Sequence, residues 1–208
     1  MKKITAFWKL ATVILCMFSG CSKAQEVVGN MDNTTDKKIL IVYLSRTKNT
    51  KAVAQMIHKN VGGSIIELEL EKPYPTNYKE IVSQVAKENE SGYLPELRTE
   101  IENIEKFDIV FLGFPTWGMQ LPPPMKSFLK KYDLSGKTVV PFNTNAGYGI
   151  GSSFQTVKEL CPKSNILEGF SVKGGIERDG ILFVMEGKKE LEVQTDVENW
   201  LKKINMIN

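Results

Sequence analysis

The 208-residue sequence contains a single histidine and three cysteines. It also lacks a Gly-x-Ser-x-Gly elbow, so nothing supports a hydrolase built on a serine, a histidine and an acid. A metal site of the common kinds needs more His and Cys ligands than the chain offers. Cys16 lies in an apolar N-terminal run and Cys21 at its end, which leaves Cys161 alone downstream. The sequence therefore has no disulfide framework, and we expect Cys161 to be a buried, unreactive thiol.

A surplus of charge is also missing once the N-terminus is set aside. The 27 basic and 24 acidic residues give a formal net charge of +3, but Lys2, Lys3 and Lys9 lie among the first 20 residues, where there is no acid. The remainder carries 24 of each sign, so bulk charge gives no argument for nucleic-acid binding. A hydrophobic content of 42% and a charged content of 25% are typical of a globular domain.

The N-terminal apolar run, from Leu10 to Phe18, is shorter than the roughly 20 residues that a membrane-spanning helix needs. With the basic residues before it, this run predicts a secretory signal peptide over residues 1–20. The ending Phe18-Ser19-Gly20-Cys21 resembles the bacterial lipobox, which implies that Cys21 is acylated and becomes the mature N-terminus. An uncleaved anchor, or an ordinary secreted protein in which Cys21 is incidental, is the alternative.

Polar residues 21–37 predict a flexible tether, because they are poor in the aromatic residues that a packed core requires. A single folded domain is then expected over residues 38–208. Taken with the leader, this organisation predicts a protein of the cell envelope, outside the cytoplasm and on the periplasmic side in a Gram-negative cell. Its contact with the membrane is expected through the lipid anchor only.

Within residues 38–208, strand patterns alternate with helix patterns. Apolar runs at residues 38–44 and 107–113 are typical of parallel strands buried on both faces. Shorter strand candidates lie at residues 66–70, 138–142 and 166–170. Apolar residues at helical spacing follow the strands. This alternation predicts an α/β fold, a doubly wound five-stranded parallel sheet with helices on both faces, and the row of glutamates in 66–70 favours an edge position for that strand.

Ligands of such sheets bind beyond the carboxyl ends of the strands, so the loops there are candidate sites. The first loop, Ser45-Arg46-Thr47-Lys48-Asn49-Thr50, runs directly into a predicted helix. Its hydroxyls and the free amides of the helix N-terminus can donate hydrogen bonds to a phosphate, which the helix dipole also favours. An ordinary Ser/Thr helix cap is the alternative. A Walker loop is excluded, because Gly-x-x-x-x-Gly-Lys-[Ser/Thr] is absent.

The second and third loops add aromatic side chains and glycines. Pro115-Thr116-Trp117-Gly118 follows the second buried run, and Trp117 there is either part of the core or a stacking surface. The third loop, residues 143–151, is rich in amides and glycines around Tyr148 and has no Gly-x-Gly-x-x-Gly dinucleotide fingerprint. Together the three loops suit a flat, phosphorylated, aromatic ligand.

These loops resemble those of flavodoxin: Ser-x-Thr-x-Asn-Thr after the first strand, Thr-Trp-Gly after the third, and a loop with Tyr and Gly after the fourth. The likeness covers nearly all of Lys38 to Asn205. It implies a sheet order of 2-1-3-4-5 with FMN bound at the carboxyl edge. The cofactor-binding residues it implies are Ser45, Arg46, Thr47, Lys48, Asn49, Thr50, Pro115, Thr116, Trp117, Gly118, Asn143, Thr144, Asn145, Gly147, Tyr148 and Gly149.

By the same resemblance, the loop at 45–50 holds the FMN phosphate, while Trp117 and Tyr148 flank the isoalloxazine ring. Gly118 lies where the family flips a peptide whose carbonyl then accepts a hydrogen bond from reduced flavin N5, which favours the semiquinone. Two positions depart from the pattern: Lys48 stands where many relatives have glycine, and Gly118 stands where the single-domain relatives often have a second Trp.

The charge around the proposed flavin loops is also unusual for the family. Residues 114–125 contain no acid, and Lys126, Lys130 and Lys131 follow. Flavodoxins typically surround the reduced flavin with acidic residues, which disfavours its anionic hydroquinone. The sequence therefore predicts a less reducing semiquinone/hydroquinone couple than is usual for the family.

The leading interpretation is an exported FMN electron carrier without a catalytic residue of its own. Its partner would be a redox protein or a membrane electron donor or acceptor. An FMN-dependent NAD(P)H:quinone-type reductase is the second interpretation, weakened by the scarcity of nicotinamide cofactors outside the cytoplasm. A flavodoxin-shaped binding module without flavin is the third. A receiver-type response regulator is excluded, because no acidic cluster follows the first strand.

Overall fold

A parallel sheet with the strand order β2-β1-β3-β4-β5 forms the centre of residues 37–208, the part of the chain that the computed structural model describes. The signal peptide, the acylated Cys21 and nearly all of the tether were predicted for residues that lie outside this part. The strands are β1 (Ile39–Tyr43), β2 (Ser64–Glu67), β3 (Ile109–Pro115), β4 (Thr138–Asn145), β5 (Asn165–Ile166) and β6 (Phe170–Lys173). The predicted 2-1-3-4-5 order is confirmed.

Five α-helices accompany the sheet in the described residues: α1 (Asn49–Val61), α2 (Tyr78–Ser91), α3 (Pro123–Lys131), α4 (Ser153–Leu160) and α5 (Gly187–Lys203). Short 3-10 turns lie at Ile104–Lys106 and Glu177–Asp179. None of these helices is long and apolar enough to cross a membrane. The first helix ends at Val61 because Gly62 and Gly63, both with positive φ, follow it.

The two strands predicted from continuous apolar runs lie at the middle of the sheet. Every residue of β1 is buried, and β3 is buried from Ile109 to Phe114. As expected, β2 is an edge strand, but it ends at Glu67 and not at residue 70. Leu68 and Leu70 nevertheless stay buried, and Leu70 forms an isolated bridge with Leu97.

The predicted fifth strand over residues 166–170 is wrong in its bounds, because the structure breaks it into β5 and β6. Ile166 pairs with Val139 and Phe170 pairs with Phe142. The segment from Ile166 to Phe170 is thus one residue longer than the stretch of β4 that it opposes, as in a β-bulge. Pro141 lies at the break. Leu167 N donates to Val139 O, so the backbone of Val139 faces the β5 and β6 side of β4. Pro141, two residues further along β4, faces the same side but has no N–H to donate.

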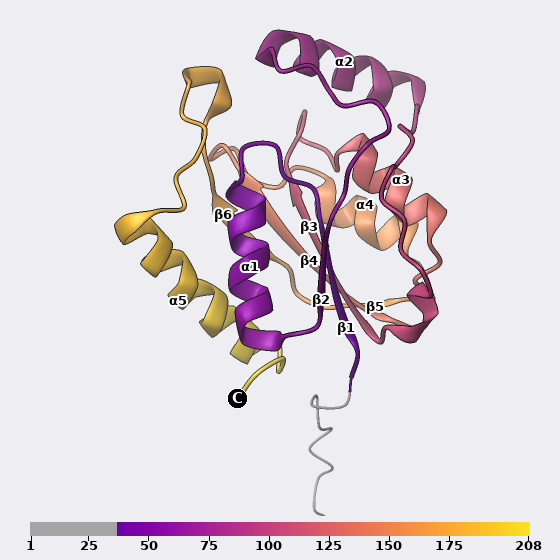
Figure 1. Ribbon diagram of the computed structural model, residues 1–208, viewed down its shortest axis with the longest axis vertical. Coiled ribbons are helices and arrows are strands. Elements are labelled where there is room, and N and C mark those ends of the chain that lie inside the picture. The colour runs from indigo at the N-terminus through magenta and orange to yellow at the C-terminus, as the bar shows by residue number, and fades with distance from the viewer. Residues whose placement is uncertain (1–36) are drawn as a thin grey trace, which may run out of the picture. The chain divides into compact units, whose positions relative to one another are not determined.

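Helices cover both faces of the sheet, as predicted (Figure 1). On one face, α1 and α5 bury residues such as Val53, Ile57 and Leu201 against β1 and β3. On the other, α3 and α4 do the same with Phe128 and Val157. Cys161, at the end of α4, is buried there, and burial raises the pKa of its thiol to about 11. Cys161 is thus the inert thiol that the sequence predicted.

The remaining helix, α2, belongs to neither face. It stands beyond the carboxyl edge of the sheet (Figure 1), and its buried residues Ile81 and Val85 belong to neither hydrophobic core. The irregular segment after it covers the sheet instead, through Leu97 and Ile101. This displacement leaves the apolar side of α2 facing the loops at the ends of the strands.

Candidate functional site

A cavity of about 470 Å³ lies beyond the carboxyl edge of the sheet, between the predicted loops and α2. Of the predicted cofactor-binding residues, eleven line it: Arg46, Thr47, Asn49, Thr50, Pro115, Thr116, Trp117, Gly118, Thr144, Asn145 and Tyr148. The other five, Ser45, Lys48, Asn143, Gly147 and Gly149, lie in the same loops but do not line it. The structure therefore brings all three loops to one place.

The first loop presents a row of free backbone donors. Within the part of the chain that the structure describes, none of the five amides from Arg46 to Thr50 donates a hydrogen bond. The next backbone amide, that of Lys51, donates to Ser45 Oγ at 3.2 Å, so the Ser45 side chain stabilises the turn that precedes α1. Free amides at the start of a 13-residue helix, with its dipole behind them, make a site for an anion.

Lys48 precedes α1 in the left-handed conformation, with φ 66°. This conformation explains why glycine suits the position, since a Cβ there costs about 1 kcal/mol or more. The side chain of Lys48 is exposed and does not line the cavity.

We expect Lys48→Gly to stabilise the fold by about 0.5–1 kcal/mol, the strain relieved less the added chain entropy of glycine. Urea unfolding followed by circular dichroism measures this. Lys59→Gly is the matched control, because Lys59 is exposed within α1 and glycine there costs about 1 kcal/mol. Equal destabilisation by both changes would contradict the prediction.

Two residues of the loop are tied to distant parts of the chain. The side-chain amide of Asn49, a residue that is 2% exposed, donates from Nδ2 to Leu182 O at 2.6 Å and to Thr47 Oγ1 at 2.8 Å, and its Oδ1 accepts from Val184 N at 3.1 Å. Thr50 Oγ1 lies 2.8 Å from Thr144 Oγ1, both buried. Asn49 therefore fixes the shape of the loop, while Thr50 couples it to the end of β4.

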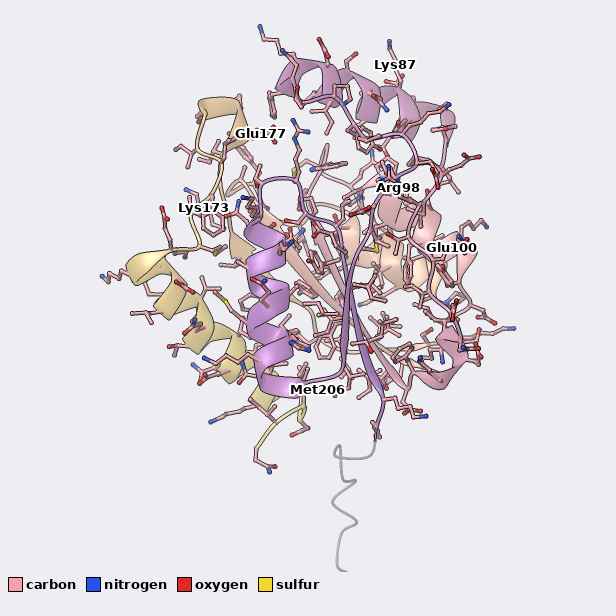
Figure 2. The ribbon with its side chains drawn as sticks, in the orientation of Figure 1. Lys87, Arg98, Glu100, Lys173, Glu177 and Met206 are labelled. Carbon is pink, nitrogen blue, oxygen red and sulfur yellow. The ribbon has the colours of Figure 1, made fainter. Side chains whose placement is uncertain are left out.

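Arg46 lines the cavity, but its guanidinium is engaged by protein. Nε pairs with the Glu177 carboxylate at 2.8 Å, and the two terminal nitrogens donate to Pro75 O at 2.9 Å and Thr76 O at 2.7 Å. Glu177 belongs to the excursion, residues 174–183 between β6 and α5. Figure 2 shows Glu177 on the side of the excursion that faces the domain. Arg46 thus joins three segments around the cavity.

The second loop is a two-residue hairpin turn. Trp117 and Gln120 exchange backbone hydrogen bonds, and Gly118 and Met119 between them both have positive φ, 55° and 60°, as in a type I′ turn. The ring of Trp117 meets that of Tyr74 edge to face, with centroids 5.3 Å apart. Trp117 packs against the core, as one interpretation predicted, and it also lines the cavity, where its role as a stacking surface stays a prediction.

The hairpin is held from two sides. Its carbonyl at Met119 accepts from Ser152 N at 3.0 Å, next to Gly151, whose φ is 55°. On the other side Lys126 Nζ donates to Gln120 Oε1 at 3.3 Å and to Asn89 Oδ1 of α2 at 2.9 Å. Burial lowers the pKa of this lysine. Among residues 37–208 no carboxylate forms an ion pair with Lys126, and its two partners, Asn89 and Gln120, both line the cavity.

In the third loop a buried asparagine connects the strand ends and a second one shapes the turn. Asn143, 0% exposed, donates to Phe114 O and Thr116 Oγ1, both at 3.0 Å. Asn145 Oδ1 accepts from the amides of Gly147 and Gly149. Tyr148, at the tip, is 64% exposed and borders the cavity.

Two walls of the cavity are formed by residues that were not predicted from the sequence. One face of α2 lines it through Tyr78, Ile81, Val82, Val85, Ala86, Asn89 and Glu90, and the excursion lines it from Gly174 to Arg178. The helix had been expected to cover the sheet. The excursion follows the carboxyl end of β6, so extending the fifth strand beyond residue 170 would have pointed to it.

Comparisons with known proteins agree with this geometry. A family model described as Flavodoxin matches residues 38–187. A candidate flavoprotein from Bacteroides eggerthii is 28% identical, with a TM-score of 0.66, over 82% of this chain and 99% of that one. A second, from Bacteroides uniformis, is 24% identical, with a TM-score of 0.65, over 80% and 98%.

A flavoprotein from Lactobacillus acidophilus, solved in complex with FMN, is 22% identical, with a TM-score of 0.59, and covers 70% of this chain and 98% of that one. At this identity the likeness shows the fold alone. No curated protein matches the sequence.

Proposed function

The chain belongs to the flavodoxin family, and on this basis we propose that it binds FMN in the cavity and transfers electrons through it. The observation that carries the proposal is the row of five free amides from Arg46 to Thr50, which ends at a cavity bordered by Trp117 and Tyr148. A phosphate at one end and a flat ring at the other match these two parts of the site. The FMN complex of the Lactobacillus acidophilus relative supports the same choice of ligand.

The residues present fit FMN. The amides of residues 46–50 and the hydroxyls of Thr47 and Thr50 would hold the phosphate. Thr144 can donate to Thr50 Oγ1, which leaves the Thr50 proton free to point at the phosphate. Trp117 and Tyr148 would flank the ring, and the apolar face of α2 would exclude water from it. Bound FMN supplies reversible uptake of one or two electrons.

We place the electron carrier first and the FMN-dependent NAD(P)H:quinone-type reductase second. For export, an acylated Cys21 and a position outside the cytoplasm, the support is the leader sequence alone. The partner we propose is a redox protein or a membrane electron donor or acceptor.

An FMN titration tests the proposal. We expect the purified chain to bind FMN and to show the visible bands of a bound flavin. Trp117→Ala should weaken binding through lost stacking, and Thr50→Ala should weaken it about tenfold or more through a lost bond to a charged group. Tyr93→Ala is the control, an exposed aromatic outside the cavity. A chain that takes up no FMN would refute the proposal, and unchanged affinity in both site variants would show that the loops were misassigned.

Lys126 is expected to raise the reduction potential of bound FMN, because an uncompensated cation near the ring stabilises the anionic reduced flavin. Lys126→Met should make the potential for the second electron more negative by on the order of 50 mV, equivalent to about 1 kcal/mol for one electron. Lys130→Met is the control, an exposed lysine on the same helix. A spectroelectrochemical titration measures both, and equal potentials in the two variants would remove Lys126 from this role.

A further inference from the structure

The ring of Trp117 is supported by a second aromatic side chain, that of Tyr74. The two rings meet edge to face, at an interplanar angle of 89°, and both pack against the same hydrophobic core. Trp117 lines the cavity and Tyr74 does not, so Tyr74 contacts Trp117 from outside the cavity. Because an edge-to-face pair has a preferred geometry, this contact restricts the orientations that the Trp117 ring can adopt.

The phenol of Tyr74 is in turn fixed by a buried acidic residue of α2. Tyr74 OH donates to Glu88 Oε2, and Gln84 Nε2 donates to Glu88 Oε1 at 2.8 Å. Glu88 is only 6% exposed, and a buried carboxyl group of this kind requires hydrogen-bond donors. Burial and the hydrogen bond to Glu88 raise the pKa of the Tyr74 phenol above its usual value, so the phenol keeps the proton that it donates.

The same turn of α2 also holds the other end of the Trp117 hairpin. Asn89, next to Glu88, accepts from Lys126 Nζ at 2.9 Å, and Lys126 Nζ donates to Gln120 Oε1 at 3.3 Å. Two neighbouring residues of α2 are thus connected to the ring of Trp117 and to the residue that closes its turn. The position of Trp117 therefore depends on α2, a helix whose buried residues belong to neither hydrophobic core.

We infer that Tyr74 is a positioning residue for the cofactor: Glu88 fixes its phenol, and its ring sets the orientation in which Trp117 stacks on a flat ring in the cavity. The inference rests on the proposed FMN site. A stacking side chain that already has its binding orientation loses less conformational entropy when the ligand arrives, so this preorganisation raises affinity. Tyr74 acts through Trp117 and has no contact with the cofactor of its own.

FMN titrations of four variants of the full chain separate the ring of Tyr74 from its hydroxyl. Tyr74→Leu removes the ring, and we expect it to weaken FMN binding about fivefold. Tyr74→Phe keeps the ring but loses the bond to Glu88, and should weaken binding about two- to threefold. Glu88→Met removes the acceptor and should have the same effect as Tyr74→Phe. Glu88→Gln keeps an acceptor oxygen on a side chain of the same size and should bind FMN as the parent chain does.

A second set of measurements tests whether the effect passes through Trp117. In a Trp117→Ala background, Tyr74→Leu should change the FMN dissociation constant less than twofold, because the ring to be positioned is gone. At saturating FMN, the visible circular dichroism of the bound flavin depends on the orientation of the neighbouring ring, and it should differ between Tyr74→Phe and the parent. Tyr132→Phe is the matched control. Tyr132 packs against the same core, accepts from Ile101 N at 2.8 Å and does not line the cavity, so its variant should keep both the affinity and the spectrum.

The possible failures are distinguishable. A parent chain that takes up no FMN contradicts the proposed function itself. A parent chain that binds FMN, with Tyr74→Leu and Tyr74→Phe of equal affinity and unchanged spectrum, overturns the inference alone. The inference also fails if Tyr74→Leu weakens binding as much without Trp117 as with it, because Tyr74 would then act by another route. If Tyr74→Leu does not fold, Tyr74→Phe, which keeps the ring, decides through its affinity and its spectrum.

Discussion

Asn49→Ala is expected to destabilise the domain by about 3 kcal/mol. The substitution removes four hydrogen bonds at once: those that Nδ2 donates to Leu182 O, to Thr47 Oγ1 and, at 3.4 Å, to Thr47 O, and the one that Oδ1 accepts from Val184 N. The two backbone groups of residues 182 and 184 lose their partner more than 130 positions away along the chain. For a domain of this size the midpoint of thermal unfolding should fall by about 6–12 °C, as measured by circular dichroism.

The same variant should lose FMN affinity, because the loop that presents the free amides is held in shape by this side chain. Asn60→Ala is the matched control on α1. Its side chain makes one local hydrogen bond, to Met56 O at 2.8 Å, so the change should cost less than about 1 kcal/mol. Asn49→Asp separates the structural role from the binding role, since it keeps the acceptor for Val184 N and places a negative charge at the proposed phosphate site. Similar unfolding midpoints for Asn49→Ala and Asn60→Ala would refute the connecting role.

The contrast between β1 and α2 shows which parts of the fold were predictable. A strand buried on both faces has a continuous apolar run, and such a run at 38–44 leaves no alternative position for β1. An amphipathic helix reveals only that one side is covered. In α2 that side faces the cavity, a placement that depends on Leu97 and Ile101 filling the sheet face from a segment with no helical period.

The candidate site divides in the same way. The row of free amides at residues 46–50 was predictable, because these donors are contiguous in the sequence and run directly into a helix. The excursion was not, because its wall residues reach the cavity through long-range contacts such as Arg46 with Glu177. Lys48 is a third case. Its left-handed backbone is set by the turn and not by the residue type, so a lysine there gives no local signal.

Gly151→Ala is expected to displace the Trp117 hairpin and abolish tight FMN binding. A Cβ at this position would lie 2.0 Å from Met119 O and 2.5 Å from Met119 C, in a backbone conformation that already disfavours a side chain. The carbonyl cannot yield locally, because Ser152 N donates to it at 3.0 Å. The hairpin must therefore move away from α4 and take Trp117 out of the cavity wall. The cost is about 1 kcal/mol of backbone strain and about 1–3 kcal/mol of overpacking.

Gly136→Ala isolates the backbone term of this cost. Gly136 also has a positive φ, 76°, but a Cβ there would meet nothing within 4 Å, and the residue lies outside the cavity. Its alanine variant should lose about 1 kcal/mol and bind FMN normally, whereas Gly151→Ala should lose about 3 kcal/mol and at least tenfold in FMN affinity. Urea unfolding and FMN titration of both variants measure the difference. Normal FMN affinity in Gly151→Ala would mean that the hairpin tolerates the displacement and that Trp117 does not need α4 to hold its place.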